Sequence, residues 1–274
     1  MGTGGPGPGR WRRRAANGHH GPVPRWAAPD GVEIDYQVAG EGPAVLLMHG
    51  FASSASVNWV RPGVVDALVR AGFTAVAYDA RGHGRSGKPH DPAAYADNAL
   101  VRDAVGLIDH LALGELAVVG YSMGAQVAAW LVPTEPRVRR AVLGGIGSRL
   151  LAPRPQERRY PAEEIARALE AEDPETVEDA TPRAFRAFAD ATKADRLALA
   201  ALQRSRVITG HPSLESIDVP VLMVVGERDT LVGDAELVAR SLPEGRLVVV
   251  PGDHLSAVTS PEFATAVVDF LSPP

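Results

Sequence analysis

The feature of this sequence that most limits its fold is an alternation of short apolar segments with helix-like segments. The apolar segments are rich in Val, Leu and Ala, and several contain almost no polar residue. Strands that are apolar on both faces are typical of a parallel sheet covered by helices on either side. The expected strands are Val32–Val38, Ala44–Met48, Thr74–Tyr78, Leu116–Val119, Ala141–Leu143, Val219–Val225 and Leu247–Val250.

Helix-like segments separate these strands along most of the chain. The expected helices are Val64–Ala71, Ala93–Leu111, Met123–Leu131, Ala235–Ser241 and Glu262–Leu271. This alternation predicts an α/β fold with a mainly parallel sheet and helices on both faces. The chain has 274 residues, of which 45% are hydrophobic and 22% charged, so it is long and apolar enough for one such core. It contains no cysteine, which excludes disulfides and a thiolate nucleophile.

The alternation is interrupted once, over residues 149–216, where no strand signal occurs. The segment PAEEIARALEAED predicts one helix. The segment TPRAFRAFADATKADRLALAALQRS predicts a further helix or a pair, with Thr181 as N-cap and Pro182 at the first helical position. We expect a helical lid at the carboxyl ends of the strands, where open α/β sheets bind ligands. A longer crossover connection is the alternative.

The first residues of the chain differ from the rest in composition. Residues 1–24 are rich in Gly, Pro and Arg and contain no acidic residue, so we expect a disordered basic tail. No apolar stretch follows Arg12–Arg14, so we expect no export signal and a cytoplasmic protein. The longest apolar runs are too short to span a bilayer, and one short basic run on an acidic chain is a weak indication of nucleic acid. We therefore expect neither a membrane nor a nucleic-acid partner.

These observations divide the chain into three parts. We assign residues 1–24 to the tail, residues 25–148 and 217–274 to an α/β core, and residues 149–216 to the helical lid.

The strongest chemical signal is the motif Gly120-Tyr121-Ser122-Met123-Gly124. It follows the apolar run Leu116–Val119 and precedes the helix-forming segment AQVAAWL. G-x-S-x-G between a strand and a helix is typical of a nucleophile elbow, in which the glycines permit a tight turn. We interpret Ser122 as a nucleophile that faces a cleft over the positive end of the helix. An ordinary turn serine is the alternative.

A serine hydroxyl needs a base before it can attack a carbonyl carbon. His254 follows the strand Leu247–Val250 and precedes the last helix, which places it at a carboxyl strand end. A loop at that position can bring an imidazole onto Ser122, so we interpret His254 as the base. A structural loop histidine is the alternative.

The imidazole in turn needs a carboxylate that orients it. Asp229 follows the strand Val219–Val225 at the same edge, and the chain order Ser, Asp, His is the one that elbow folds use. Glu227 and Asp234 are competing candidates. Asp253 adjoins the histidine and is interpreted as a turn former.

The loop after the strand Ala44–Met48 is the expected source of an oxyanion-hole donor. The expected donors are the backbone N–H of Phe51 and that of Met123, directly after the nucleophile. His49 is expected to brace this loop through hydrogen bonds.

A substrate pocket is expected next to these groups. The residues that we assign to it are Phe51, Tyr121, Phe185 and Phe188. Phe185 and Phe188 are predicted on an apolar helix face of the lid, and simple packing of the lid on the core explains them equally well.

A second glycine motif, Gly82-His83-Gly84-Arg85-Ser86-Gly87, fits the pattern G-x-G-x-x-G. A dinucleotide site requires the third glycine to open a helix, whereas residues 88–92 contain two prolines here. We interpret the motif as a structural turn beneath the active-site edge. No histidine or cysteine spacing typical of a metal site occurs, so we expect no metal.

Taken together, these segments resemble the α/β-hydrolase fold superfamily. The matching blocks, which span roughly residues 25–274, are MHGF (48–51), YDARGHGRS (78–86), GYSMG (120–124), VVGERDTLV (224–232) and GDHLSAV (252–258). The resemblance implies a mainly parallel eight-stranded sheet, a small helical lid after the sixth strand, and no cofactor. It also supports Ser122, Asp229 and His254 as a catalytic triad.

The nucleophile position separates several chemistries within this resemblance. It holds serine, whereas the resemblance implies aspartate there in haloalkane dehalogenases and epoxide hydrolases. We therefore predict a carboxylesterase-like serine hydrolase that cleaves an ester or lactone of a small molecule through an acyl-enzyme. Carbon–carbon bond hydrolysis, cofactor-free perhydrolysis and a ligand-binding protein without turnover are the alternatives. The sequence leaves the oligomeric state unassigned.

Overall fold

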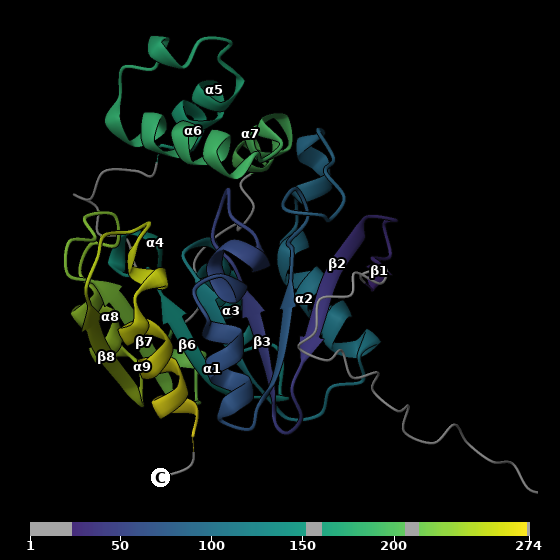
Figure 1. The fold of residues 1–274 in the computed structure, drawn as a ribbon, viewed down its shortest axis with the longest axis vertical. Helices are drawn as coiled ribbons and strands as arrows, with labels where there is room; N and C mark the ends of the chain where they lie inside the picture. The colour runs from purple at the N-terminus through teal and green to yellow at the C-terminus, as the bar shows by residue number, and fades with distance from the viewer. Residues whose placement is uncertain (1–23, 152–160, 206–213, 273–274) are drawn as a thin grey trace, which may run out of the picture.

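The computed structural model describes residues 24–151, 161–205 and 214–272. The predicted disorder of the tail therefore concerns residues that lie, except for Pro24, outside the described part of the chain. From residue 25 onward the described chain forms an α/β structure, with a second group of helices above one edge of the sheet (Figure 1).

Within residues 24–272, apart from the two undescribed gaps, eight strands form a single sheet in the order β1-β2-β4-β3-β5-β6-β7-β8. The first two pairings, β1 with β2 and β2 with β4, are antiparallel, and the remaining pairings are parallel. The predicted fold class is thereby confirmed. The strands are β1 (Arg25–Ala27), β2 (Glu33–Ala39), β3 (Ala44–Met48), β4 (Thr74–Tyr78), β5 (Leu116–Tyr121), β6 (Val138–Gly144), β7 (Val221–Gly226) and β8 (Gly245–Val250).

Helices cover both faces of the sheet (Figure 1). Successive side chains of a strand point to opposite faces, so each strand contributes to an apolar core on both sides of the sheet. In β3, Leu46 packs into one apolar cluster, whereas Val45 and Leu47 pack into the other. The first cluster includes residues of α2 (Ala99–His110), α3 (Met123–Leu131) and α8 (Ala235–Ser241). The second includes residues of α1 (Val64–Arg70) and α9 (Pro261–Leu271).

The helix predicted over Ala93–Leu111 is divided in the structure. A 3₁₀ turn, η2 (Pro92–Tyr95), precedes α2, and Asp97 and Asn98 between them have left-handed backbone conformations, each with φ of 55°. A continuous helix cannot pass through such residues. The other short elements are η1 (Ser56–Val60), a π-helical turn, α4 (Ser148–Leu151), η3 (Pro174–Thr176), η4 (Leu214–Ser216) and η5 (Ala257–Thr259).

Three further helices lie between β6 and β7 and above the carboxyl edge of the sheet (Figure 1). They are α5 (Ala162–Glu170), α6 (Ala180–Thr192) and α7 (Arg196–Arg204), and we refer to them as the upper helices. The prediction of Thr181 as the N-cap of α6 is wrong, because Asp179 takes that position and Thr181 lies in the first turn. The loop between α6 and α7 begins with Lys193 in a left-handed conformation, which separates the predicted pair.

The strand register aligns the loops that carry the candidate site. Met48 at the end of β3 pairs with Gly120, and Tyr121 at the end of β5 pairs with Gly144 of β6. On the far side, Gly226 of β7 pairs with Val250 of β8. The chain therefore leaves these parallel strands at nearly the same level, and the loops that follow meet above one edge.

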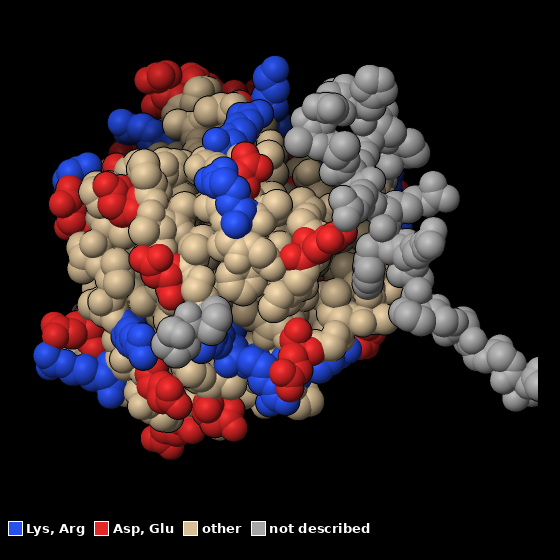
Figure 2. Space-filling view, turned by 60° about the horizontal axis from the view of Figure 1, so that its bottom comes forward, with Lys and Arg blue, Asp and Glu red and all other residues tan. Residues whose placement is uncertain are grey.

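The surface mixes charges of both signs. Figure 2 shows acidic and basic side chains interspersed around the rim of one face, with uncharged residues at its centre. Within the described residues, no helix combines the length and the apolar character needed to cross a membrane.

Candidate active site

Ser122 occupies a strained turn between β5 and α3. Its backbone angles, φ 51° and ψ −111°, are unusual for a residue with a side chain, and its N–H donates to the carbonyl oxygen of Gly144 at 2.8 Å. The flanking glycines are required by close backbone contacts. A Cβ on Gly124 would lie 2.0 Å from the carbonyl oxygen of Met48, and one on Gly120 would lie 2.3 Å from that of Gly124. The turn therefore presents Ser122 above the end of the strand.

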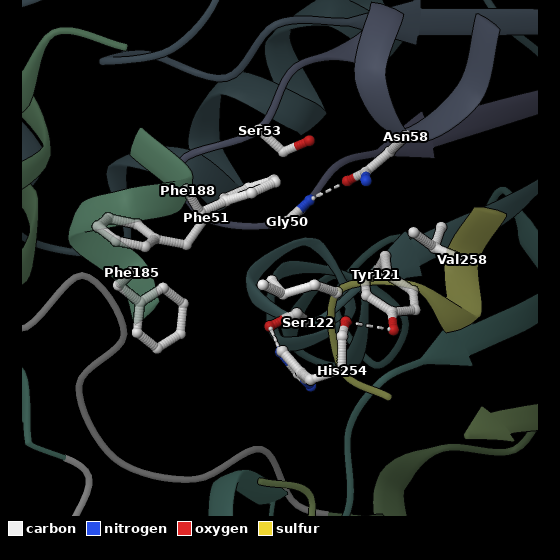
Figure 3. Close-up of a pocket in the computed structure, with 11 residues that line it drawn as sticks. Gly50, Phe51, Ser53, Asn58, Tyr121, Ser122, Phe185, Phe188, His254 and Val258 are labelled. Carbon is white, nitrogen blue, oxygen red and sulfur yellow. Dashed lines mark hydrogen bonds between the residues drawn. The ribbon is translucent and has the colours of Figure 1, made fainter. Parts of the chain in front are cut away.

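Three side chains from different loops form one hydrogen-bonded chain at this edge. The Oγ of Ser122 lies 2.9 Å from Nε2 of His254, and Nδ1 of His254 lies 2.8 Å from Oδ2 of Asp229 (Figure 3 shows the first of these contacts). A carboxylate accepts hydrogen bonds, so Nδ1 carries the proton and Nε2 is free to accept from the serine hydroxyl.

The acid at the end of this chain is fully buried. The side chain of Asp229 is 0% exposed, and that of His254 is 10% exposed. The second carboxylate oxygen, Oδ1, accepts from the N–H of Leu231 at 3.0 Å, which fixes the orientation of the group. The competing acids lie elsewhere: Glu227 pairs with an exposed arginine, and Asp234 caps α8 by accepting from the backbone.

Tyr121 holds the loop that carries the histidine. Its hydroxyl donates to the carbonyl oxygen of His254 at 2.8 Å, and its ring packs edge-on against Phe263. Burial raises the pKa of Tyr121, so the hydroxyl keeps its proton and its role as donor. The sequence predicted a pocket-lining residue here. Tyr121 does border the cavity next to Ser122, but its hydroxyl is engaged by the backbone.

The loop after β3 is held by side chains on both sides. The N–H of Gly50 donates to Oδ1 of Asn58 at 2.8 Å, and Nε2 of His49 accepts from the N–H of Ala80 at 3.0 Å. The opposite nitrogen of His49 therefore carries the proton and donates to the carbonyl oxygen of Gly50 at 2.8 Å. Burial lowers the pKa of His49, which keeps the ring neutral in this role.

The second glycine motif lies directly beneath this loop. His83 donates from Nδ1 to the carbonyl oxygen of Arg81. Its ring packs edge-on against those of His49 and Phe51, with ring centroids 5.0 and 5.9 Å away. Burial lowers the pKa of His83 to about 3, so it is a neutral packing residue. The motif thus supports the loop after β3 from below.

Two adjoining cavities of the described part of the chain border His254, and the first of them also borders Ser122. The first has a volume of about 20 Å³ and is bordered by Ser122, His254, the loop after β3 and the rings of Phe185 and Phe188 from α6 (Figure 3). The second has a volume of about 230 Å³ and lies between α6 and the loops after β7 and β8. Its lining includes His254, Leu255 and the cation Arg228, which is exposed and paired with Glu227.

Comparison with known families agrees with this architecture. A family model described as alpha/beta hydrolase fold matches residues 43–208. The chain belongs to the α/β hydrolase fold family. This α/β hydrolase resembles curated relatives of several kinds. It is 36% identical over 117 residues to an epoxide hydrolase of Caballeronia sordidicola, in an alignment that covers 43% of this chain but only 35% of that relative. It is 30% identical over 271 residues to a 2-(acetamidomethylene)succinate hydrolase of Mesorhizobium japonicum, covering 88% of this chain and 92% of the relative.

Solved structures share the same fold over most of the chain. A hydrolase from Pseudomonas aeruginosa PA01 has a TM-score of 0.75 and 28% identity, covering 93% of this α/β hydrolase and 100% of that chain. The enol-lactonase of Burkholderia xenovorans LB400 has a TM-score of 0.73 and 23% identity, covering 91% and 100%.

The residues predicted from the sequence meet at one place in this α/β hydrolase. Ser122, His254 and Asp229 are in direct contact, and Phe51 and Phe185 pack edge-on with ring centroids 5.7 Å apart beside them. Asn58 was missed because its role depends on a hydrogen bond across a loop, for which the sequence carries no signal. Among the described residues, no cluster of three or more His, Cys, Asp or Glu could hold a metal ion.

Proposed function

We propose that this protein is a serine hydrolase that cleaves a small carboxylic ester or lactone through an acyl-enzyme. The observation that carries the proposal is the unbroken hydrogen-bonded chain from Ser122 through His254 to the buried Asp229. This is the arrangement that activates a serine hydroxyl. The strained turn at Ser122 supports it, because strained backbone persists where function requires it.

In the proposed reaction Ser122 Oγ attacks the carbonyl carbon while its proton passes to Nε2 of His254. Asp229 holds the ring and stabilises the imidazolium. The imidazolium then protonates the leaving-group oxygen. The bond between this oxygen and the carbonyl carbon breaks, which releases the alcohol and leaves the acyl-serine. Water attacks this ester with His254 as base and releases the acid and the free serine.

The backbone supplies the proposed oxyanion hole. The N–H of Gly50 is engaged by Asn58, which leaves the next amide in this loop, that of Phe51, as the proposed donor. The second donor is the amide of Met123, the first residue of α3, where helical N–H groups have no partner within the helix. Loss of one such donor typically lowers kcat by about 100-fold or more.

We further propose that the upper helices act as a lid, so that residues 149–216 form one unit and residues 25–148 and 217–274 the other. Phe185 and Phe188 of α6 border the cavity beside Ser122, which supports this division (Figure 3). The apolar lining favours an uncharged acyl group. No cofactor takes part in the proposed reaction.

The test is the replacement of the nucleophile. Ser122→Ala should abolish turnover of 4-nitrophenyl acetate and labelling by a fluorophosphonate probe, measured by absorbance and by mass spectrometry of the labelled peptide. Ser241→Ala, at the end of α8, is the matched control and should label like the wild type. Unchanged turnover in Ser122→Ala would refute the proposal.

Other outcomes distinguish the remaining functions. Rapid labelling of Ser122 without hydrolysis of any ester or lactone in a panel would favour carbon–carbon bond hydrolysis or perhydrolysis by the same side chains. Absence of labelling in the folded protein would favour a ligand-binding role. The panel should include a short-chain amide, because the Mesorhizobium japonicum relative is named for an acetamido substrate. Epoxide opening is not favoured, because the elbow holds serine.

A further inference from the structure

A second serine lies at the first cavity and has no assigned role. Ser53 is only 5% exposed and borders the same cavity as Ser122. Its Oγ has no hydrogen-bond partner among the residues that the structure describes. A buried hydroxyl without a partner destabilises the folded state, so its presence needs an explanation.

The backbone holds Ser53 in this position. Ala52, directly before it, has a left-handed conformation with φ of 57°, and the N–H of Ser53 donates to the carbonyl oxygen of Gly50 at 3.3 Å. The next residue behaves differently: Oγ of Ser54 accepts from the N–H of Val57 at 3.2 Å and so serves the local turn. Figure 3 shows Ser53 among the residues around the cavity, on the side away from His254.

The proposed mechanism assigns the two cavities to the two halves of the substrate. The leaving oxygen has to receive its proton from His254, which borders both cavities. The loop after β3, which carries the proposed oxyanion donor, borders only the first cavity, so we assign the leaving group to the second. The acyl group then lies toward the loop after β3, in the first cavity. With about 20 Å³, that cavity has room for little more than one or two small groups beyond the carbonyl carbon.

We propose that Ser53 selects short acyl groups that carry an uncharged oxygen next to the ester carbonyl, such as 2-hydroxy or 2-alkoxy acyl groups. This inference rests on the proposed function. Because Oγ of Ser53 is almost entirely buried, the proposal includes a rotation of this side chain on substrate binding. The rotated hydroxyl donates to that oxygen and so gains the partner that it lacks in the free protein. An ionised carboxylate does not fit, because no lysine or arginine among the described residues borders this cavity. Besides Ser122 and His254, its polar lining residues are the uncharged Ser53, Asn58 and Tyr121, and apolar side chains such as Phe188 and Val258 make up most of the rest.

The experiment compares two esters of matched size, ethyl glycolate and ethyl propionate, with acid release followed in a pH-stat. The measured quantity is the ratio of kcat/KM for glycolate to that for propionate. In Ser53→Ala this ratio should fall about 5-fold relative to the wild type, as expected for one hydrogen bond. Ser54→Ala is the matched control, and its ratio should equal that of the wild type.

A second pair of esters tests the orientation. In 2-methoxyethyl acetate the extra oxygen lies in the leaving group, and butyl acetate is its match in size. The ratio of kcat/KM for these two esters should be the same in Ser53→Ala and in the wild type. An unchanged glycolate ratio in Ser53→Ala, or a change confined to the leaving-group pair, would overturn the inference.

Thermal unfolding separates selectivity from a structural role. Ser53→Ala removes an unpartnered buried hydroxyl, so its melting temperature should not fall. A lower melting temperature with an unchanged ratio would show that Ser53 is structural and would also overturn the inference. If the wild type hydrolyses none of the four esters and Ser122 is not labelled, the proposed function itself fails.

Discussion

The carboxyl edge of the sheet and the upper helices are held in place in different ways. At the edge, buried hydrogen bonds fix each reacting group, including those from Ser122 N–H to Gly144 and from the Tyr121 hydroxyl to His254. The upper helices pack on the core through buried apolar side chains such as Phe185, but their polar contacts with the core involve more exposed groups. The hydroxyl of Thr192 of α6 lies 2.9 Å from the carbonyl oxygen of Ala52 and equally far from that of Phe188 in its own helix, and shares its proton between them. Directly before α7, Oδ1 of Asp195 lies 3.1 Å from Nε2 of His90, whose side chain is half-exposed.

This difference indicates that the two regions have separable tasks. The core alone positions the nucleophile, the base and the acid, whereas the upper helices contribute side chains to the cavity walls. Changes at the edge should therefore alter kcat, and changes at the contacts of the upper helices should alter KM and stability. Substitutions in the two regions test this separation.

Asp229→Asn should give the largest of these effects. Asparagine keeps the shape but can present its N–H₂ group to the imidazole, which favours the wrong tautomer of His254. By analogy with the same substitution in serine proteases, kcat should fall by about 10⁴-fold. Steady-state kinetics on 4-nitrophenyl acetate would measure it, with circular dichroism to verify the fold. A loss below about 10-fold would argue against the role of Asp229.

Tyr121→Phe should have an intermediate effect. It removes the donor to the buried carbonyl oxygen of His254 but keeps the ring that packs on Phe263. Leaving that carbonyl unpartnered should cost about 1–3 kcal/mol of unfolding free energy. The base should also become less well placed, so kcat should fall more than KM changes. Denaturant unfolding and kinetics together would measure both, and a change in KM alone would contradict this account.

Thr192→Val should have a smaller effect, on a different quantity. The variant loses the hydrogen bond to Ala52, and valine is nearly the same size as threonine. The free energy of unfolding should fall by about 0.5–1.5 kcal/mol, and KM should rise while kcat stays within about 2-fold. If kcat fell as steeply as in Tyr121→Phe, the separation between the two regions would not hold.

The smallest effect concerns the pH dependence of stability at Asp195. Burial raises the pKa of Asp195, but hydrogen bonds from the N–H of Ala198 and from His90 outweigh it, so the pKa lies below the ordinary 3.8. A carboxyl group with a lowered folded-state pKa stabilises the protein above its unfolded pKa, and this contribution is lost as the pH falls through the folded value. Asp195→Asn should thus be less stable than wild type at pH 7, by at most about 1 kcal/mol.

The measurement is chemical denaturation of both proteins at several pH values. The difference in unfolding free energy should shrink as the pH falls from about 5 toward 3, the range in which the carboxyl group takes up its proton. A difference that grows between about pH 5 and pH 3 would have the wrong sign for this role of Asp195.

Much of the core could be predicted because its signals are local. The predicted bounds of Ala44–Met48, Thr74–Tyr78 and Met123–Leu131 agree with the structure, since each is a buried apolar run with clear turn residues at its ends. The strand Arg25–Ala27 was missed because three residues at the edge of a sheet carry no periodic pattern. The break in the helix before Ala99 was missed because a left-handed conformation at Asp97 and Asn98 leaves no required residue type in the sequence.

The site could be predicted where a residue follows a strand, and not where it acts across loops. The placements of Ser122, Asp229 and His254 next to one another follow from parallel strands whose carboxyl ends share an edge. The engagement of Asn58 with Gly50 depends on how a π-helical turn folds back on a loop. The unpartnered Oγ of Ser53 is likewise visible only when its surroundings are known.

The bond from Tyr121 to His254 has one more consequence. Tyr121 and Ser122 are consecutive residues, and each is hydrogen-bonded to His254. Ser122 Oγ contacts the imidazole, and the tyrosine hydroxyl donates to the carbonyl oxygen of the same histidine, so the three residues form a closed ring of covalent and hydrogen bonds. When thermal motion displaces the end of β5, the hydroxyl and the imidazole are carried along as a pair. Asp229 lies outside this ring. Movement of the strands relative to one another would therefore disturb the hydrogen bond between His254 and Asp229 before the one between His254 and Ser122.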